Sequence, residues 1–366
     1  MKLRIDQQNL INAVNIVSKA VPSKTSMPIL ECILIDAGTE KIRMIANDME
    51  FGIETSVQGT IEDHGIIAID AEIFGNIVRK LPAGEVILRS EGEQVEISCG
   101  QAVFNILGRD GHDFPYLPEI EKENGIEMSQ FTLRDVISRT IFSVSTNDTN
   151  KMMTGELFEI QDQTLRVVAL DGHRISIRTV GLARSYDNRK VIIPGKSLSE
   201  LCKILSGDME KKAGIYFTQK HALFSFDDTI VVTRLIEGEY FNIDQMLSTQ
   251  YSTHVSVNRQ EFLSCLDRAL LLVKEEDKKP IVLMIKQDTM GIKIRTALGR
   301  MDEDVAITKD GEDLNIGFNP RFLLDALRAI EEENIDIYLM NSRAPAFIRN
   351  DSTFCYLVLP VNFISV

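Results

Sequence analysis

One pattern of hydrophobic positions occurs three times along the chain. In each copy two apolar residues flank one polar residue, as in a strand. The apolar positions that follow are spaced i, i+3, i+4, i+7 and i+11, as on one face of a helix. The three copies are Leu3, Ile5, Leu10, Ala13, Val14, Val17, Val21; Ile126, Met128, Leu133, Val136, Ile137, Thr140, Val144; and Val255, Val257, Phe262, Cys265, Leu266, Ala269, Val273. Each copy predicts a strand followed by an amphipathic helix.

A second amphipathic helix follows each first one at a nearly constant distance. Its leading apolar residue is Phe74, Leu198 or Leu324, which lies 69, 70 or 67 residues after the second strand position of its copy. Unrelated helices have no reason to keep this distance, so the chain is predicted to repeat one domain three times. We place the domains at residues 1–120, 121–250 and 251–366, joined by a first linker (112–120) and a second linker (240–253).

The segments between and after the helices alternate apolar and polar residues and are separated by Gly, Asn and Asp turns, which is typical of antiparallel strands. The predicted fold is therefore α+β, with two helices packed on antiparallel sheets in each domain. The six predicted helix windows are 6–24, 70–82, 129–145, 195–206, 258–276 and 320–333.

The net charge of −14 argues at first against a nucleic-acid partner. The helix windows, however, hold 13 Lys and Arg against 13 Asp and Glu, so their net charge is zero and the whole −14 lies in strands and loops. A helical layer less acidic than the rest could face a polyanion, although ordinary solvated helix faces would give the same count.

Composition also sets the compartment that we expect. No apolar run approaches the ~18 residues of a membrane span, and the first residues lack the apolar region of a signal peptide. The five Cys are scattered and never form a C-x-x-C pair. Reduced thiols and a cytoplasmic location are therefore expected, without a disulfide framework or metal site.

The most conspicuous candidate for chemistry is Asp171-Gly172-His173-Arg174. A hydrolase could use Asp171 and His173 as an acid/base pair. An Asp-Gly turn between two strand-like runs predicts a hairpin instead, and Asp48 occupies the equivalent turn of the first domain without a His. The chain has no phosphate loop, nucleophile elbow or H-E-x-x-H motif. We therefore predict no catalytic residues, no cofactor and no metal.

Several strings, taken with the triplication, give the chain a resemblance to a known family along its full length. They are MPIL (27–30), IVRKLP (77–82), DFPYLP (113–118), DGHR (171–174), VIIPGKSLSEL (191–201), RLIEGEY (234–240), IGFNP (316–320) and YLVLPV (356–361). In this order they resemble the bacterial replicative sliding clamps, the beta subunits of DNA polymerase III.

The resemblance implies a head-to-tail homodimer that closes into a six-domain ring, with helices lining the hole and sheets outside. Such a ring holds duplex DNA by topology, so its contacts can be weak and independent of sequence. The resemblance implies Lys24, Lys151 and Lys196 as DNA-binding residues. The arginines of the predicted helix windows join them as candidates: Arg79, Arg134, Arg139, Arg259, Arg268 and Arg321. The implied dimer interface joins Phe104 and Ile106 of an edge strand to Leu271 and Leu272 of the other chain.

The resemblance also implies a hydrophobic pocket for a short linear peptide shared by the replicative polymerase, the clamp loader, repair polymerases and other partners. Its residues here are Met153, Thr154, Leu170, Gly172, His173, Arg174, Ile175, Met246, Asn319, Phe322, Ala344, Pro345, Leu357, Leu359, Pro360 and Val361. The chain departs from the family at Tyr240-Phe241-Asn242-Ile243, where F-P-x-Y is usual. It also departs at Asn362, where a basic residue is common, and in continuing through Phe363-Ile364-Ser365-Val366. These differences bear on the preferred peptide rather than on the pocket's existence.

The function we predict is that of a DNA sliding clamp, a non-enzymatic processivity factor that encircles duplex DNA and tethers polymerases. Two alternatives remain open at this point. One is the hydrolase that uses Asp171 and His173. The other is a scaffold that binds partner peptides but never encircles DNA.

Overall fold

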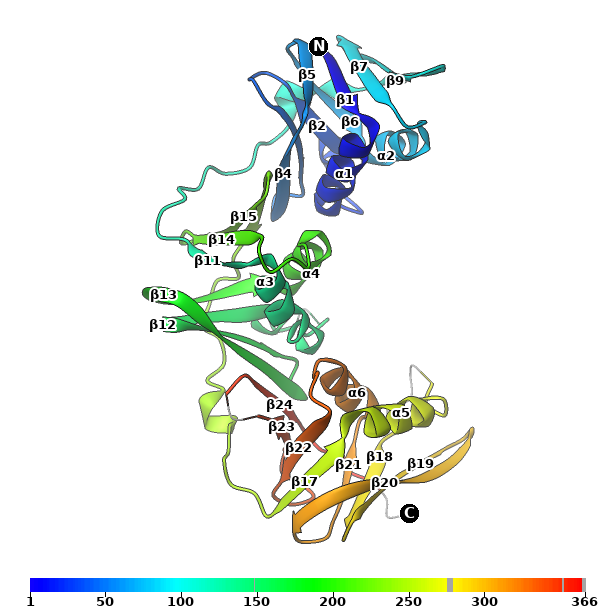
Figure 1. Cartoon of the computed structure of the whole chain (residues 1–366), viewed down its shortest axis with the longest axis vertical. Helices are drawn as coiled ribbons and strands as arrows, with labels where there is room; N and C mark the ends of the chain where they lie inside the picture. Colours follow the sequence, from blue (N-terminus) through cyan, green and yellow to red (C-terminus); the bar gives the residue numbers. More distant parts are fainter. Residues whose placement is uncertain (148, 275–278, 351, 364–366) are drawn as a thin grey trace. The chain divides into compact units, whose positions relative to one another are not determined.

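The computed structural model describes residues 1–147, 149–274, 279–350 and 352–363. The chain forms two compact units (Figure 1). Unit 1 comprises Met1–Arg134 and Lys196–Leu235, and unit 2 comprises Asp135–Gly195 and Ile236–Val366. The α-helices of the described residues are α1 (Gln7–Val17), α2 (Ala71–Lys80), α3 (Gln130–Ser138), α4 (Gly195–Ile204), α5 (Arg259–Leu270) and α6 (Pro320–Arg328). None of these helices has the length and apolar character needed to span a bilayer.

Unit 1 holds two antiparallel sheets. The smaller has the order β5-β1-β7-β8-β9, with β1 Lys2–Asp6, β5 Gly59–Asp63, β7 Glu85–Glu91, β8 Gln94–Cys99 and β9 Ala102–Leu107. The larger has the order β10-β6-β2-β3-β4-β16-β15-β14-β11. Its strands are β2 Cys32–Asp36, β3 Ile42–Asn47, β4 Phe51–Val57, β6 Ile66–Asp70, β10 Arg109–Asp110, β11 Ile126–Ser129, β14 Lys212–Phe217, β15 His221–Phe226 and β16 Thr229–Arg234.

Unit 2 holds one ten-stranded antiparallel sheet, whose order is β12-β13-β24-β23-β22-β17-β20-β19-β18-β21. Its strands are β12 Gly155–Leu170, β13 Arg174–Pro194, β17 Thr253–Asn258, β18 Ile281–Lys286, β19 Thr289–Thr296, β20 Gly299–Gly311, β21 Leu314–Phe318, β22 Asn334–Leu339, β23 Ala346–Arg349 and β24 Phe354–Val358.

The three predicted strand–helix copies are present, as β1–α1, β11–α3 and β17–α5. The first six periodic positions are buried in all three copies, and the last, Val21, Val144 or Val273, is partly exposed. Leu10, Leu133 and Phe262 are fully inaccessible to solvent. A side chain caps the helix start in each of them: Asp6 accepts from the backbone N–H groups of Gln8 and Asn9, the Ser129 hydroxyl accepts from that of Thr132, and Asn258 accepts from that of Glu261. Pattern and caps together therefore fix where these helices begin.

The predicted helix windows were too long at their carboxyl ends. The window 129–145 ends as an α-helix at Ser138, and a 3-10 turn (Ile141–Ser143) follows it. The Thr140 hydroxyl lies 2.9 Å from the carbonyl oxygen of Val136, so it competes for a helix carbonyl near the point where the helix stops. The apolar spacing continues past the end of α3 because the following 3-10 turn still packs toward the core. Residues 275 and 276 of the window 258–276 lie outside the described residues.

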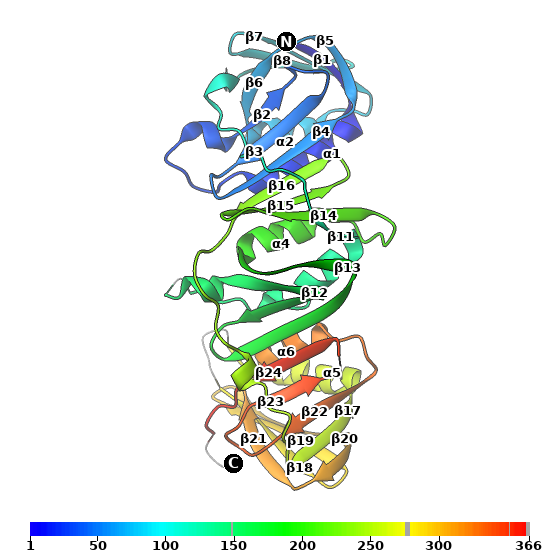
Figure 2. The same cartoon turned by 90° about the vertical axis from the view of Figure 1, so that its left-hand side faces the viewer.

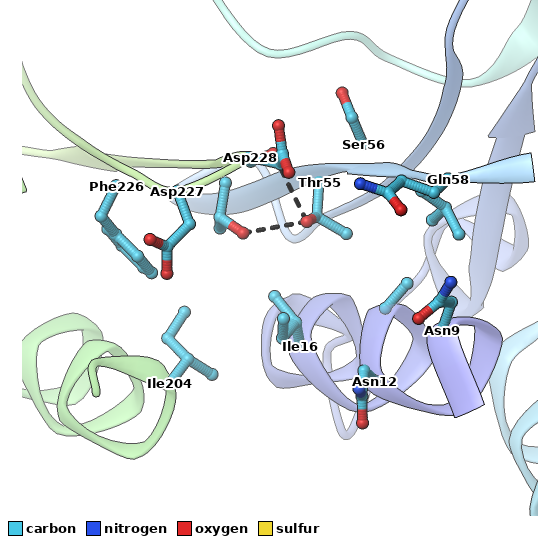
Figure 3. Close-up of a pocket in the computed structure, with 13 residues that line it drawn as sticks. Asn9, Asn12, Ile16, Thr55, Ser56, Gln58, Ile204, Phe226, Asp227 and Asp228 are labelled. Carbon is cyan, nitrogen blue, oxygen red and sulfur yellow. Dashed lines mark hydrogen bonds between the residues drawn. The ribbon is translucent and has the colours of Figure 1, made fainter. Parts of the chain in front are cut away.

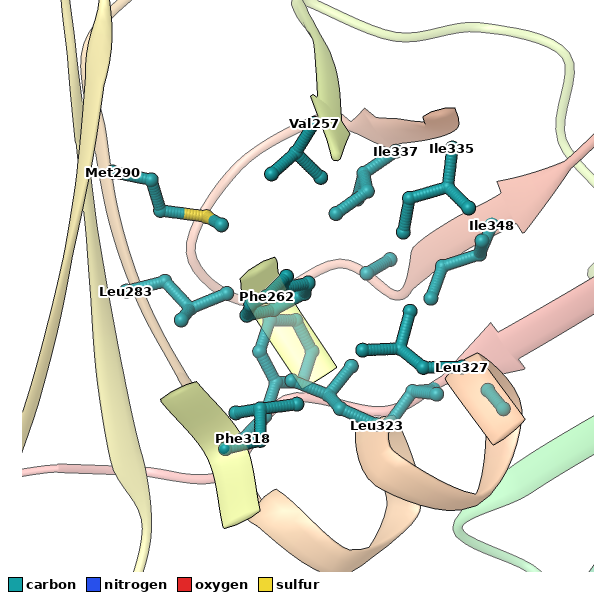
Figure 4. Close-up of a cluster of buried hydrophobic side chains, with 14 of the residues drawn as sticks. Val257, Phe262, Leu283, Met290, Phe318, Leu323, Leu327, Ile335, Ile337 and Ile348 are labelled. Atoms are coloured by element: carbon teal, nitrogen blue, oxygen red, sulfur yellow. The ribbon is translucent and has the colours of Figure 1, made fainter. Parts of the chain in front are cut away.

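The core of the third repeat lies between its helices and the sheet (Figure 4). Phe262 of α5 and Leu323 and Leu327 of α6 point toward Val257, Ile335 and Ile337 on the strands. All six side chains are almost inaccessible to solvent. Burying a large apolar side chain stabilises by roughly 1.5–3 kcal/mol, so this cluster fixes α5 and α6 side by side on one face of the sheet.

The sheets run from one repeat into the next, because β16 of the second repeat pairs with β4 of the first and β24 of the third pairs with β13 of the second. The two linkers lie on the sheet face away from the helices. Phe114 and Leu117 of the first linker pack with Leu34 and Ile45. Tyr240, Phe241, Ile243 and Leu247 of the second pack with Ile177, Phe347 and Leu357. The compact units therefore do not follow the repeats, and the domain bounds 1–120, 121–250 and 251–366 stay a prediction.

A buried carboxyl group in unit 2 is expected to make the folding stability of the protein fall as the pH rises. Glu156 on β12 is fully buried, its Oε1 lies 2.8 Å from the Thr140 hydroxyl, and its Oε2 has no hydrogen-bond partner. Burial raises the pKa of Glu156 well above its ordinary value. The folded chain then holds a proton that the unfolded chain releases above the ordinary glutamate pKa, so stability falls as the pH rises through and beyond that value.

We expect Glu156→Gln, which keeps the size and supplies a neutral side chain, to flatten this dependence. Removing one such proton changes the slope of the unfolding free energy by up to about 1.4 kcal/mol per pH unit. Calorimetric melting temperatures between pH 5 and 8 measure the effect, with the exposed Glu119→Gln as a matched control. Parallel curves for Glu156→Gln and the unsubstituted chain would contradict the expectation.

Candidate functional site

Charge on the helices is more favourable to a polyanion than the sequence windows indicated. The observed helices hold nine Lys and Arg against six Asp and Glu, a net charge of +3. Asp6, Asp70 and the acidic residues 331–333 lie outside these helices, and residues 275 and 276 are not among the described residues. The basic residues are Arg79, Lys80, Arg134, Lys196, Lys203, Arg259, Arg268, Arg321 and Arg328. The acidic residues are Glu72, Asp135, Glu200, Glu261, Asp267 and Asp325.

Most of the predicted DNA-binding residues are exposed. Lys24 and Lys151 lie in loop and 3-10 segments, and Arg79, Arg134, Lys196, Arg268 and Arg321 lie on helices. The side chain of Lys196 is 80% exposed, and its Nζ is 3.5 Å from Asp48. Arg268 is paired with Glu303 by two hydrogen bonds. Arg259 is half-buried and donates to the carbonyl oxygens of Glu332 and Leu327.

Arg139 differs from this set. It is only 9% exposed and lies just after the end of α3. Its guanidinium pairs with Asp135 at 2.5 Å and Glu331 at 2.6 Å, and donates to the carbonyl oxygen of Ala329 at 2.6 Å. Arg139 therefore ties the end of α6 to the second repeat and is not available to a phosphate. Its placement on an exposed helix face was wrong because the predicted helix extended past Ser138.

A hollow of about 290 Å³ opens between α1 and α4 in unit 1 (Figure 3). Asn9, Asn12 and Ile16 of α1 and Ile204 of α4 line it, below the strand that carries Thr55. The Thr55 hydroxyl bonds that of Thr229 at 2.9 Å and the carbonyl oxygen of Asp228 at 3.4 Å. The Asp227 and Asp228 carboxylates at its rim repel anions, so this hollow is not a phosphate site.

The segment Asp171–Arg174 forms the predicted hairpin turn between β12 and β13. Asp171 Oδ1 accepts the backbone N–H groups of His173 (2.9 Å) and Arg174 (3.1 Å), and Gly172 adopts φ +85°, a left-handed conformation that favours glycine. The His173 ring stacks on Phe322 of α6, with centroids 5.9 Å apart. Asp171 thus holds the backbone of His173 rather than its ring, and the geometry of an acid/base pair is not formed.

Arg174 ties this turn to two other segments. Its guanidinium bonds Asp171 Oδ2 at 3.0 Å, Asp325 of α6 at 2.6 Å and the carbonyl oxygen of Phe142 at 2.5 Å. It also lies over the Phe322 ring, 4.5 Å from the centroid. Planar, multidentate bonding of this kind is specific to arginine. Asp325 and Phe142 could not be predicted as partners, because both are far from Arg174 along the chain.

Most residues of the predicted partner pocket come together in unit 2. Leu170, Ile175 and Leu357 are direct cross-strand neighbours on the linker side of the sheet, and Met153 packs against them. The backbone N–H of Leu359 donates to the carbonyl oxygen of His173 at 2.9 Å, which brings the chain's last strand beside the turn.

Further pocket residues lie on four other segments of unit 2. Met246 is half-exposed in a 3-10 turn (Asp244–Met246) of the second linker. Asn319 caps α6, accepting from the backbone N–H of Arg321. Thr154 ends the 3-10 turn Lys151–Thr154, while Ala344 and Pro345 precede β23.

Pro360 and Val361 follow Leu359 past the end of β24. The Val361 backbone N–H donates to the carbonyl oxygen of Gly317, and a Cβ atom at Gly317 would lie 2.7 Å from Phe363 Cδ1. Phe363 of the terminal extension therefore packs on β21, next to the pocket residue Asn319. Residues 364–366 lie outside the described residues.

The two predicted halves of the subunit interface lie in different units. β9 forms one end of the five-stranded sheet and carries Phe104, which is exposed, and Ile106, which is half-buried. Leu271, just after α5, is 79% exposed, and Leu272 lies beside Gly299 at the start of β20. Val103 and Leu107 of β9 and Leu298 before β20 are also exposed apolar residues that the sequence reading missed. Val103 and Leu107 lie on the opposite face of this edge strand from Phe104 and Ile106, so the predicted pair did not include them.

Comparison with known proteins decides the family. Models of the DNA polymerase III beta subunit match the whole chain: its N-terminal domain at residues 1–118, its central domain at 127–242 and its C-terminal domain at 244–362. The chain belongs to the bacterial beta sliding clamp family. It is 34% identical to the beta sliding clamp of Bacillus subtilis, over 99% of both chains.

Solved structures agree with this family. A DNA polymerase III beta subunit from Eubacterium rectale is 55% identical and superposes with a TM-score of 0.96, over 99% of this chain and all of the other. The Bacillus subtilis sliding clamp is 33% identical with a TM-score of 0.95, over the full length of both. The predicted three-domain clamp fold, with its six helices on antiparallel sheets, is confirmed.

Membership of the family defines the activity. Sliding clamps are non-catalytic processivity subunits of DNA polymerase III that encircle duplex DNA as a dimeric ring, so this chain is a DNA sliding clamp that acts with the replicative polymerase. The comparisons give no support to the hydrolase or the non-encircling scaffold.

Proposed function

We propose that eight basic residues of the helices and neighbouring segments, seven exposed and Arg259 half-buried, contact DNA phosphates without reading sequence. The proposed set is Lys24, Arg79, Arg134, Lys151, Lys196, Arg259, Arg268 and Arg321, with Arg139 left out because it is buried. The observation that carries the proposal is the +3 charge of the helices in a chain of net charge −14. Loose phosphate contacts of this kind allow a ring to slide.

Lys196→Glu is expected to shorten the lifetime of the loaded clamp on DNA. Lys196 stands at the start of α4 with most of its side chain in solvent, so the substitution replaces an attractive charge by a repulsive one. Loss of a phosphate contact should lower the slope of log affinity against log salt by about 1. Release rates from circular DNA at several salt concentrations measure this. Lys220→Glu, on an exposed strand turn, is the control. Unchanged retention by Lys196→Glu would remove that residue from the set.

We propose further that the pocket around the Asp171–Arg174 turn binds a short linear peptide shared by the replicative polymerase, the clamp loader and repair polymerases. The support is an apolar floor of Leu170, Ile175 and Leu357 beside a few fixed polar groups, which suits a peptide of apolar residues and one glutamine. Phe241 adds an aromatic ring to the same cluster. A fluorescent peptide of this composition should bind one molecule per chain, and Phe322→Ala should weaken it at least tenfold.

The remaining proposals concern assembly and location. We propose that β9, with Phe104 and Ile106, joins the surface of Leu271 and Leu272 on the second chain. Both surfaces expose apolar side chains, and β9 ends its sheet. The domains are proposed to span 1–120, 121–250 and 251–366, and the cytoplasm is the proposed compartment, where the chain would meet DNA and its polymerases.

A further inference from the structure

A cavity of about 690 Å³ lies beside the first linker in unit 1. Its floor is Leu223, Ile230 and Val232 of β15 and β16, the neighbouring strands labelled in Figure 2. One wall is the chain from Tyr116 to Lys122, which includes the end of the first linker. Arg43 and Glu54 of β3 and β4 complete it. This volume falls in the range of sites that bind small molecules and peptide side chains.

The cavity has a counterpart in unit 2, because both units contain the same hairpin arrangement. Asp48 Oδ1 accepts the backbone N–H groups of Glu50 and Phe51, just as Asp171 caps its own turn, and Met49 (φ +75°) stands where Gly172 stands. The Arg234 N–H donates to Glu50 O at 2.8 Å, as Leu359 does to His173. The two turns and the strands that leave them are therefore structurally equivalent.

This equivalence can be followed across the sheets from one paired residue to the next. In unit 2 the row that starts at the turn is Leu170, Ile175, Leu357, Phe347 and Tyr338. In unit 1 the row is Asn47, Gly52, Val232, Leu223 and Tyr216. Val232 and Leu223, on the cavity floor, thus correspond to Leu357 and Phe347.

The two rows are covered differently by the linkers. In unit 2 the second linker fills the space over Leu357 and Phe347 with Tyr240, Phe241 and Ile243. In unit 1 Leu117 of the first linker occupies the space over Gly52, where a Cβ atom would lie 2.1 Å from Leu117 Cδ2. A cavity remains over Leu223, Ile230 and Val232; Ile230 is partly exposed, whereas Leu223 and Val232 reach it with only 3% of their surface. The first linker thus leaves empty a place that aromatic side chains fill in unit 2.

The rim of the cavity is acidic. Glu54, Glu119 and Glu121 line it together with Arg43 and Lys122. Arg43 is paired with the buried Asp36 at 2.5 Å, and Lys122 donates to the Ser225 hydroxyl at 3.0 Å. The lining residues carry three acidic groups against two basic ones, a formal charge of −1, and Arg43 also pairs with Glu54 at 3.6 Å. A ligand with a positive charge beside its apolar groups is favoured there.

We propose that this cavity is a second docking site, which binds an extended peptide segment carrying two aromatic side chains next to basic residues. The aromatic rings would cover Leu223, Ile230 and Val232, as Tyr240 and Phe241 cover the equivalent floor in unit 2. The basic groups would face Glu119 and Glu121. The site is separate from the pocket at the Asp171–Arg174 turn and does not depend on it.

The probe is the tetrapeptide acetyl-Phe-Arg-Phe-Arg-amide, titrated into the intact protein by calorimetry. We expect one molecule bound per chain and at least tenfold weaker binding of acetyl-Phe-Glu-Phe-Glu-amide. Ile230→Trp, which fills the cavity, should weaken the basic peptide at least tenfold, whereas Ile230→Val should leave it unchanged. Glu119→Lys with Glu121→Lys, both on the exposed wall, should weaken it several-fold without a change in melting temperature.

The position of binding is read from isoleucine methyl resonances. Shifts at Ile120 and Ile230, with none at Ile175, would support the proposal. Absence of binding at millimolar peptide, equal affinity for the acidic peptide, or shifts confined to Ile175 would overturn it. If Ile230→Trp lowers the melting temperature, the double Glu variant and the methyl shifts decide the outcome.

Discussion

Leu271→Ala combined with Leu272→Ala is expected to convert the dimer into a monomer. Leu271 is 79% exposed in the single chain, which is unusual for a leucine beside a helix end, and Leu272 is only half-buried. If the second chain covers these residues, each truncation costs about 2–5 kcal/mol. A ring of two chains has two such interfaces, so four leucines are lost together and the effect on closure is correspondingly large.

Light scattering at micromolar protein measures this change. We expect the unsubstituted chain to show twice its 41.2 kDa mass and the double variant to show one chain. Met209→Ala, which truncates another exposed apolar side chain away from the proposed surface, should remain dimeric. A double variant that stays a dimer would show that Leu271 and Leu272 lie outside the interface.

Arg174→Ala is expected to destabilise unit 2 and to abolish peptide binding at the hairpin-turn pocket. Its guanidinium, 11% exposed, pairs with Asp171, which is 15% exposed, and with Asp325 on α6, and it also bonds the carbonyl oxygen of Phe142. Removing one partner of a buried ion pair leaves the other charges without compensation, at a cost of about 3–5 kcal/mol. The Phe322 ring also loses the cation above it.

Thermal melting and peptide titration separate these two effects. Arg174→Lys keeps the charge but not the fork of donors, so it should recover part of the stability and little of the binding. Phe322→Ala removes only a pocket wall and should weaken binding with a smaller fall in melting temperature. Full stability and full peptide affinity in Arg174→Ala would contradict the role assigned to this side chain.

The local parts of the fold were predictable because their causes are local. The spacing of Leu10, Ala13, Val14 and Val17 forces one helix face into the core, and Asp171-Gly172 is a turn whatever surrounds it. Helix ends were less predictable, since Val144 keeps the apolar spacing although the α-helix stops at Ser138. An apolar period reports burial, and a 3-10 turn can be buried in the same way.

The site was predictable in its location and less so in its contacts. Arg139 has the spacing of a surface residue, and only folding brings Glu331 and Ala329 beside it. Arg174 depends likewise on Asp325 and Phe142. The exposure of Val103 and Leu107 depends on β9 being the last strand of its sheet, which alternation cannot reveal. The contacts of Arg139 and Arg174 and the exposure of Val103 and Leu107 thus depend on residues distant in sequence, which the hydrophobic pattern does not report.

The most direct test of the encircling mechanism is the release of the loaded clamp from DNA that is cut. The clamp is loaded onto a nicked circular plasmid by the clamp loader, the free protein is removed, and the plasmid is linearised at one site. Because a ring held by topology can slide off an end, we predict that the clamp stays on the circle and leaves the linear DNA rapidly. Equal retention on circular and linear DNA would contradict the account and point to direct binding instead.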